Sequence, residues 1–200
     1  MPNGVTRVTA NNPSALTLDG TNTYIADGWV VDPGPDDPAH LDAIVAAASN
    51  IEGIVLTHGH SDHAAGAERL AARAGVEVFR PSGGEQVGPF SVIPTPGHSP
   101  DHVSLLWGRV LFAGDMMLGS GSVFVGGEEG SMSAYLDSLR RLQALELDAI
   151  CPGHGPVVWD PRARLDEYLA HRLERERRVL EAVEAGAVTR DEVLDRAWSE

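Results

Sequence analysis

The sequence predicts a mixed α/β (α+β) fold, a four-layer αββα sandwich in which two β-sheets pack face to face and helices cover both outer sides. The first thirty residues contain short β-branched and apolar runs that are separated by turn residues. From there to residue 160, the chain alternates between strand patterns and helix patterns, twice over. One long helix pattern follows and predicts a C-terminal helical tail.

Strands are predicted where apolar and β-branched residues lie between turn formers. In the first part of the chain we expect them at residues 5–9, 16–18, 23–26 and 29–31. The turn signal Asp27-Gly28 favours a tight hairpin between the last two of these. Later strands are expected at residues 51–56, 76–79, 91–94, 103–107, 110–113 and 148–151.

Helices are predicted where apolar residues recur at helical spacing. Within the sandwich we expect them at residues 41–48, 62–74 and 133–145. The tail begins with a long helix at residues 162–184, which Gly186 ends. Thr189 and Glu192 have the spacing of a capping box and predict a second, short helix.

The overall charge and the cysteine content narrow the class of protein. The net charge is −14, so the average surface field repels polyanions, and all 15 cationic residues are Arg. A single cysteine, Cys151, allows no disulfide within the chain. We see neither a signal-peptide pattern nor an apolar run of membrane-spanning length, and therefore expect a cytoplasmic protein with no membrane partner.

A dense cluster of metal-binding residue types follows the strand predicted at residues 51–56, in the run Thr57-His58-Gly59-His60-Ser61-Asp62-His63. Buried imidazoles need hydrogen-bond partners, so this many titratable groups gain little from packing alone. His58 and His60 are two residues apart at a strand end and should point to the same side. One metal ion can take this pair, and a second can take Asp62 and His63, because zinc accepts imidazole and carboxylate ligands.

Three further candidate ligands, His98, Asp115 and His154, lie downstream. Each follows an apolar strand and lies in a glycine-containing loop, where the backbone can approach a ligand closely. With the first cluster they supply five His and two Asp, enough for two metal sites that keep open positions for water. Structural metal sites are usually closed by four protein ligands, so this arithmetic favours catalysis.

The chain resembles the metallo-β-lactamase-fold hydrolase superfamily. The run His58-x-His60-x-Asp62-His63, followed by His98, Asp115 and His154, matches the ligand order of that superfamily. The resemblance covers most of residues 1–160, which would form the catalytic domain, and leaves residues 161–200 as a C-terminal helical extension. It implies one metal ion on His58, His60 and His98, a second on Asp62, His63 and His154, and Asp115 as the bridge between them.

Within that superfamily the chain is most similar to the lactamase-β-like protein 2 branch. The motifs that carry this similarity are residues 18–24 (Leu-Asp-Gly-Thr-Asn-Thr-Tyr), residues 95–102 and residues 152–156. The resemblance implies an endoribonuclease acting on single-stranded RNA, or a thioesterase. In that branch the catalytic domain carries a winged-helix-like C-terminal piece. The extension at residues 161–200 resembles only the start of that piece, so we expect a truncated one.

The expected chemistry follows from the metals. Two divalent ions, most readily Zn²⁺ but also Mn²⁺ or Fe, would share a hydroxide that attacks a carbonyl carbon or a phosphorus. Asp62 is expected to orient this nucleophile in addition to binding metal. His102, four residues after His98, is a second candidate catalytic residue. It would either donate a proton to the leaving group or support a metal ligand by a hydrogen bond.

The predicted function is a dinuclear-metal-dependent hydrolase, and the substrate stays open between several classes. The resemblance favours single-stranded RNA or another phosphodiester, with a small-molecule thioester or ester as the alternative. Hydroxyacylglutathione ranks lower because the chain lacks Lys anchors, and a β-lactam or a non-enzymatic metal-binding module ranks lowest. The oligomeric state is open as well.

The tail helix carries an Arg-rich run at residues 171–178 that invites comparison with nucleic-acid-binding helices. Arg172 with Glu176, and Glu174 with Arg178, have the i,i+4 spacing of ion pairs. Opposite charges at that spacing usually form a solvated helix face. We therefore expect this run to be exposed and dispensable.

Overall fold

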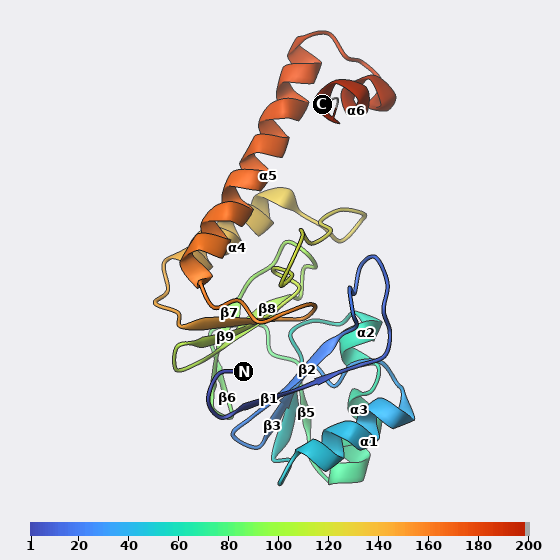
Figure 1. Cartoon of the computed structure of the whole chain (residues 1–200), viewed down its shortest axis with the longest axis vertical. Helices are drawn as coiled ribbons and strands as arrows, with labels where there is room; N and C mark the ends of the chain where they lie inside the picture. The colour runs from blue at the N-terminus through green and yellow to red at the C-terminus, as the bar shows by residue number, and fades with distance from the viewer. Residues whose placement is uncertain (199–200) are drawn as a thin grey trace.

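The computed structural model describes residues 1–198 and has the predicted four-layer arrangement (Figure 1). Two five-stranded sheets lie face to face. The first has the order β1-β2-β3-β4-β5, with bounds Val5–Thr9, Asn22–Ala26, Trp29–Val31, Gly53–Val55 and Val78–Phe79. The second has the order β10-β9-β8-β7-β6, with bounds Ala149–Pro152, Val110–Gly114, Val103–Trp107, Phe90–Pro94 and Gln86–Val87.

Helices flank the two sheets on their outer sides (Figure 1). Beside the first sheet lie α1 (Pro38–Ala47), α2 (Ser61–Ala64) and α3 (Ala67–Ala74). Beside the second sheet lie α4 (Met132–Gln143) and the base of α5 (Pro161–Glu184). The upper part of α5 projects away from the sandwich, and α6 (Arg190–Trp198) folds back against it.

Three hydrophobic clusters fill the three spaces between the four layers. The alternation of side chains along each strand explains them, because successive residues face opposite sides of a sheet. In β2, Tyr24 enters the cluster between the sheets, whereas its neighbour Ile25 enters the cluster under α1 and α3. In β9, Phe112 likewise faces the first sheet, whereas Leu111 faces α4 and α5.

The structure differs from the sequence-based expectation in three places. Residues 16–18 are not a strand: the Ser14 hydroxyl accepts from the backbone N–H of Thr17, and the Thr17 hydroxyl donates to the carbonyl of Asn12, which holds a turn with only one isolated bridge. The helix expected at residues 62–74 is two helices, which divide at Gly66, where an added Cβ would lie 2.9 Å from the carbonyl oxygen of Pro35. The two-residue strand β6 was not predicted, because it is too short to produce an alternating pattern.

The tail follows its predicted outline, with one correction. Gly186 ends α5 with a φ of +86°, and the Glu192 carboxylate accepts from the Thr189 backbone N–H, as a capping box requires. The expected pair of Arg172 with Glu176 is wrong, because the Arg172 guanidinium donates to the carbonyl of Val123 instead. Ser199 and Glu200, the end of the predicted extension, lie outside the described residues. Among residues 1–198, no helix combines the length and apolarity that crossing a membrane requires.

The topology brings several strand ends to one edge of the sandwich. β9 runs parallel to β10, and two antiparallel pairings make β7 parallel to β9 as well. The carboxyl ends of these three strands therefore meet at the same edge. β4, in the first sheet, ends immediately before the His-rich run. The loops that carry all the candidate ligands thus leave from neighbouring strand ends.

Candidate metal centre

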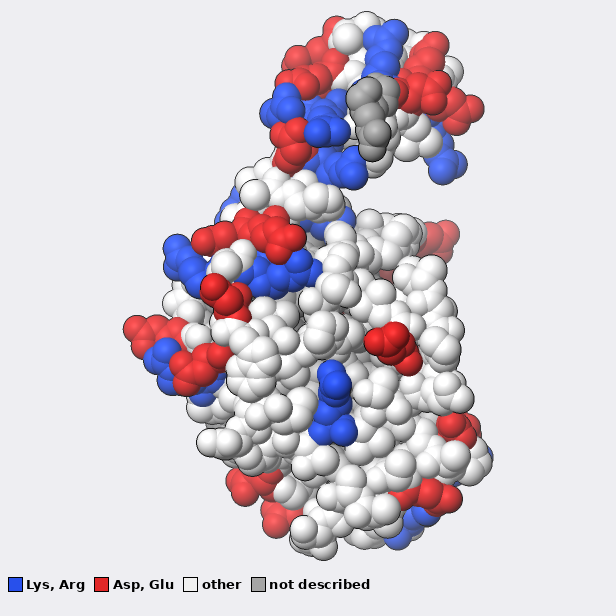
Figure 2. Space-filling view, in the orientation of Figure 1, with Lys and Arg blue, Asp and Glu red and all other residues white. Residues whose placement is uncertain are grey.

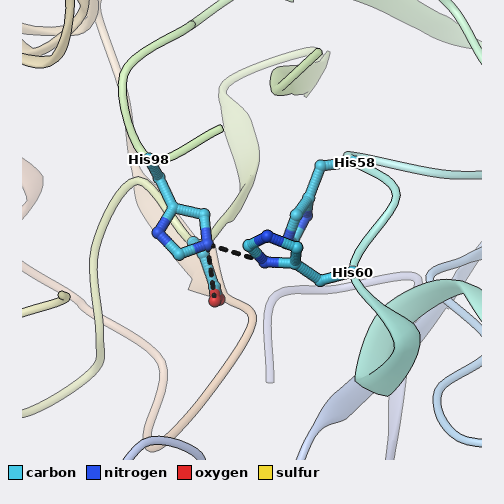
Figure 3. A group of neighbouring side chains, drawn as sticks. His58, His60 and His98 are labelled. Atoms are coloured by element: carbon cyan, nitrogen blue, oxygen red, sulfur yellow. Dashed lines mark hydrogen bonds and ion pairs between the residues drawn. The ribbon is translucent and has the colours of Figure 1, made fainter. Parts of the chain in front are cut away.

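The structure brings all seven predicted ligands together at this edge. They form two groups, within each of which the potential ligand atoms lie within 4.8 Å of one another. The first group is His58, His60, His98 and Asp115, and the second is Asp62, His63 and His154. Figure 3 shows the rings of His58 and His60, from the loop after β4, converging with that of His98, from the loop after β7.

Asp115 lies between the two groups. Its Oδ1 atom is 3.4 Å from Nε2 of His63 and 3.3 Å from Nε2 of His154, both in the second group. Its Oδ2 atom is 3.5 Å from Nε2 of His98, in the first group. One carboxylate oxygen therefore faces each group, which is the arrangement a bridging ligand needs.

Each imidazole of the centre has one ring nitrogen engaged by an outer partner. A ligating His usually donates its second N–H to an acceptor of this kind, which fixes the tautomer and the ring orientation. The pairs are His58 Nδ1 with Thr57 Oγ1 (3.0 Å), His60 Nε2 with Glu129 Oε2 (3.3 Å), His63 Nδ1 with Asp32 Oδ2 (2.9 Å), His98 Nδ1 with Phe124 O (2.9 Å) and His154 Nδ1 with Gly20 O (3.3 Å). The other nitrogen of each ring is left to face the centre.

Two buried polar atoms support a cation at this position. Among the described residues, His58 Nε2 and Asp115 Oδ1 are buried without a hydrogen-bond partner. Such atoms are rare in native proteins and point to an unassigned water or ion. A set of imidazole nitrogens and carboxylate oxygens suits zinc and other borderline divalent metals. The residues therefore fit a pair of metal ions.

The charges of the centre also favour cations. Burial lowers the pKa of His154, but the close carboxylates of Asp115 and Asp62 outweigh burial and raise it to about 9. Burial raises the pKa of Asp115, yet the neighbouring His63 and His154 hold it well below its ordinary value. Asp115 thus stays ionised. Protons on the imidazoles compete with metal ions for the same nitrogens, so metal binding releases protons.

Asp32 is an important residue of the centre that the sequence did not reveal. It is 2% exposed and has a φ of +50°. Besides its contact with His63, its carboxylate accepts from both the backbone N–H and the hydroxyl of Thr57, each at 2.7 Å. The signal available was Asp32-Pro33-Gly34, which indicates a strand end but not a buried carboxylate.

The loop that carries His154 is held by residues of the motif at 18–24. The side-chain amide of Asn22 donates to the carbonyls of Pro152 (3.1 Å) and Gly155 (2.8 Å). The hydroxyl of Tyr24 also donates to the carbonyl of Pro152, at 2.8 Å. This part of the motif therefore fixes the position of His154 rather than contacting a metal itself.

His102 lies behind Asp115 and is 1% exposed. Its Nε2 atom accepts from the backbone N–H of Asp115 at 3.0 Å, so its proton is on Nδ1, which is 2.9 Å from the hydroxyl of Thr95. Asp62, in contrast, is half-buried at the open side of the second group. Its Oδ2 atom is 3.4 Å from Nε2 of His154.

A cavity of about 330 Å³ borders the first group of ligands at His58, and His102 also lines it. Its lining is mostly apolar, with Leu56 and four prolines, Pro81, Pro94, Pro96 and Pro100. Arg80 and Asp101 supply the charged side chains of the lining. The cavity has the size and character of a site for part of a small organic molecule.

Comparisons with known sequences agree with this geometry. A family model described as the metallo-beta-lactamase superfamily matches residues 16–88 and 79–154. The beta-lactamase-like protein 2 homolog of Caenorhabditis elegans is 33% identical over 239 residues, which cover 100% of this chain and 79% of that protein. The atrochrysone carboxyl ACP thioesterase of Aspergillus fumigatus is 31% identical over 210 residues, which cover 90% of this chain and 65% of that protein.

Comparisons with solved structures show the same fold. A metallo-beta-lactamase family protein from Thermus thermophilus is similar with a TM-score of 0.76 and 22% identity, over 98% of this chain and 87% of that one. The protein TTHA1623, solved in a di-iron-bound form, is similar with a TM-score of 0.67 and 24% identity, over 80% of this chain and 96% of that one. The chain therefore belongs to the metallo-beta-lactamase superfamily of metal-dependent hydrolases, and its sequence is similar to beta-lactamase-like protein 2.

Proposed function

We propose that the protein is a dinuclear, zinc-dependent hydrolase that cleaves the thioester or ester bond of a small acyl compound. The observation that carries the proposal is the position of Asp115, whose two carboxylate oxygens face two separate groups of imidazoles. The mostly apolar cavity beside His58 supports an acyl substrate. Zinc is chosen because the donors are imidazole nitrogens and carboxylate oxygens.

The side chains of the centre have two roles, to bind the metal ions and to orient the attacking water. Two divalent ions bound by the seven residues would supply an activated water and stabilise the negative charge that develops during hydrolysis. Burial and the neighbouring imidazoles of His63 and His102 hold the pKa of His58 well below its ordinary value, so His58 is a neutral ligand. Asp62 lies at the open side, and although burial raises its pKa, the neighbouring His154 and His63 lower it below its ordinary value. Asp62 is therefore ionised and placed to orient the attacking water.

The charges around the centre support a small acyl substrate over RNA. Glu129 contacts His60 at the rim, and the cavity lining has a single cation, Arg80, together with the carboxylate of Asp101. On the face drawn in Figure 2, the sandwich carries isolated charges, and the Arg residues gather on the tail together with acidic ones. RNA-binding surfaces need several cations along the phosphate path. The similarity to a protein named as an ACP thioesterase points the same way.

Phosphodiester cleavage of single-stranded RNA is a second candidate, and one observation favours it. The guanidinium of Arg175 lies 4.9 Å from the ring centre of Trp198. Both residues line a groove of about 690 Å³ that also includes Val125, which directly follows Phe124, the residue whose carbonyl contacts His98. Paired aromatic and Arg side chains are surfaces on which unpaired bases stack.

One experiment separates the candidates. The metal content of the purified chain is measured together with hydrolysis of an acyl thioester, an aryl ester, a bis-aryl phosphodiester, a single-stranded RNA, a hydroxyacylglutathione and a chromogenic β-lactam. We expect about two metal ions per chain, with turnover of the thioester or ester. Turnover of the RNA alone would replace the first candidate by the second. An Asp115→Ala variant is the control for contaminating hydrolases, and failure of the wild type to retain metal after reconstitution would contradict both candidates.

A further inference from the structure

A single irregular loop, residues 116–124, directly follows one of the seven metal-ligand residues and hydrogen-bonds to two others. It begins directly after Asp115 and contains no helix or strand. The backbone N–H of Gly119 donates to the carbonyl of His154 at 2.9 Å. The carbonyl of Phe124 accepts from Nδ1 of His98 at 2.9 Å. The path of this 116–124 loop therefore affects ligands of both metal groups.

The helix α5 holds the first half of this loop through two side chains that are one turn apart. The guanidinium of Arg164 donates to the carbonyls of Leu118 (3.2 Å) and Gly121 (2.8 Å). The hydroxyl of Tyr168 accepts from the backbone N–H of Leu118 at 2.8 Å. Tyr168 is 3% exposed, and the Arg164 guanidinium lies 4.7 Å from its ring centre, so the two side chains also fix each other.

The second half of the loop is held by Arg172, one further turn along α5. Its guanidinium donates to the carbonyl of Val123, which directly precedes Phe124. It also lies 5.3 Å from the ring centre of Tyr135 in α4. The Tyr135 hydroxyl in turn donates to the carbonyl of Met116, at 2.6 Å. The loop is thus fixed at both ends by side chains that are themselves in contact.

The points where the helices hold the loop alternate with the points where the loop meets the ligands. The loop starts at the ligand Asp115 and contacts two other ligands at residues 119 and 124. Side chains of α4 and α5 hold it at residues 116 and 118, between the first two of these positions, and at residues 121 and 123, between the last two. An irregular segment without these contacts would sample many backbone conformations, and ordering it would oppose metal binding.

We propose that Arg164, Tyr168 and Arg172 are positioning residues for the metal centre. By fixing the 116–124 loop from one face of α5, they hold Asp115, His98 and His154 in the arrangement that binds two metal ions. The tail helix is then a functional part of the metal site. The inference rests on the metal centre of the proposed function but not on its substrate, and metal retention by the wild type tests that centre separately.

The test uses Tyr168→Phe, Arg172→Met and the double variant of the full chain. Arg178→Met is the matched control, because Arg178 is an exposed Arg on the same helix that pairs with Glu174. Zn²⁺ affinity is measured by competition with a chromogenic chelator, and backbone hydrogen exchange of the loop is measured on chelator-treated protein. We expect the double variant to bind Zn²⁺ about 10–100-fold more weakly, with faster exchange in the loop and no change in Arg178→Met.

A purely structural role of α5 would give a different result. The thermal midpoint of the chelator-treated double variant would fall while its Zn²⁺ affinity stayed at the wild-type value, and that outcome would overturn the proposal. Tyr168→Phe keeps the buried ring and loses only the hydroxyl, so it remains informative if the double variant does not fold. We expect it to lower the affinity severalfold, and an unchanged affinity would also overturn the proposal. Arg172→Lys keeps one donor for Val123 and should recover part of the affinity that Arg172→Met loses.

Discussion

The Nε2 atom of His102 accepts a hydrogen bond from the backbone N–H of Asp115 over 3.0 Å, which ties the residue between the two metal groups to the start of β8. Burial is the main reason that the pKa of His102 falls to about 3, and the nearby His98 lowers it further. The ring is therefore neutral, and its one proton points to Thr95. We expect His102 to position Asp115 rather than to donate a proton to a leaving group.

Replacement of His102 distinguishes these two roles. His102→Ala leaves the N–H of Asp115 buried and unpaired, at a cost of about 1–3 kcal/mol in the free energy of unfolding, and we expect weaker metal binding. His102→Gln offers an amide oxygen to the same N–H and should recover part of both losses. The pH profile of kcat/KM should keep its shape in both variants. Loss of its alkaline limb would instead identify His102 as the proton donor.

The depressed pKa of His102 also predicts a pH dependence of stability. In the unfolded chain its pKa is near the ordinary 6.5, and in the folded protein it is about 3. Between these two values the His102 ring is protonated in the unfolded chain but neutral in the folded protein. The contribution of His102 to the free energy of unfolding is therefore complete above pH 6.5 and is lost as the pH falls from 6.5 to 3. The measurement is urea unfolding of chelator-treated wild type and His102→Gln. The stability advantage of the wild type should shrink across that range, and a constant difference would contradict the assigned pKa.

Asp115 is expected to be indispensable for both metal groups. Asp115→Ala removes the carboxylate that faces His63 and His154 on one side and His98 on the other. We predict near-complete loss of hydrolysis and a fall in bound metal below two ions per chain. The measurement is metal analysis beside steady-state kinetics. Full activity with only one ion lost would rule out a bridging role.

The seven candidate ligands could be named from the sequence because their residue types and short spacings have few structural explanations. The run from His58 to His63 places four metal-binding side chains at one strand end, and a strand pattern precedes each of the three later ligands. The sandwich was predictable for a related reason. Alternating and helical patterns record which face of each element is buried, and the three clusters follow those patterns.

What sequence patterns missed depends on contacts between distant parts of the chain. Asp32 meets His63 across 31 residues, and Glu129 meets His60 across 69, so no local spacing reports either contact. Arg172 shows the same limit in the tail. Its spacing to Glu176 indicated an exposed ion pair, but the 116–124 loop offers its guanidinium the carbonyl of Val123, and α4 offers it the ring of Tyr135. The spacing of charges within one helix cannot predict a contact with a residue that is distant in the sequence.

Asp32 is expected to control metal binding through His63. Asp32→Asn keeps one oxygen acceptor but cannot accept from His63 and from both donors of Thr57 with the same geometry. We predict a metal affinity about 10–100-fold lower, as for other outer partners of ligating histidines. Asp36→Asn is the matched control, because that carboxylate is exposed and pairs with Arg69. Equal affinities of the two variants in a chelator competition would show that the Asp32 contact is dispensable.

We predict that Gly153 is required because a side chain at this position has no room, and not because of the backbone conformations that glycine allows. A Cβ at this position would lie 2.6 Å from Oδ1 of Asp115 and 2.7 Å from Cε1 of His63, inside the second metal group. Gly153→Ala should therefore displace both side chains and reduce bound metal, with a loss of about 1–3 kcal/mol in the free energy of unfolding from overpacking. Gly59→Ala is the control, because Gly59 also neighbours a ligand but is exposed, with its nearest atom 3.1 Å away at the end of the Asp101 side chain. Metal analysis after dialysis should give a lower content only for Gly153→Ala. A normal content in that variant would mean that Asp115 and His63 can move aside without losing the metal.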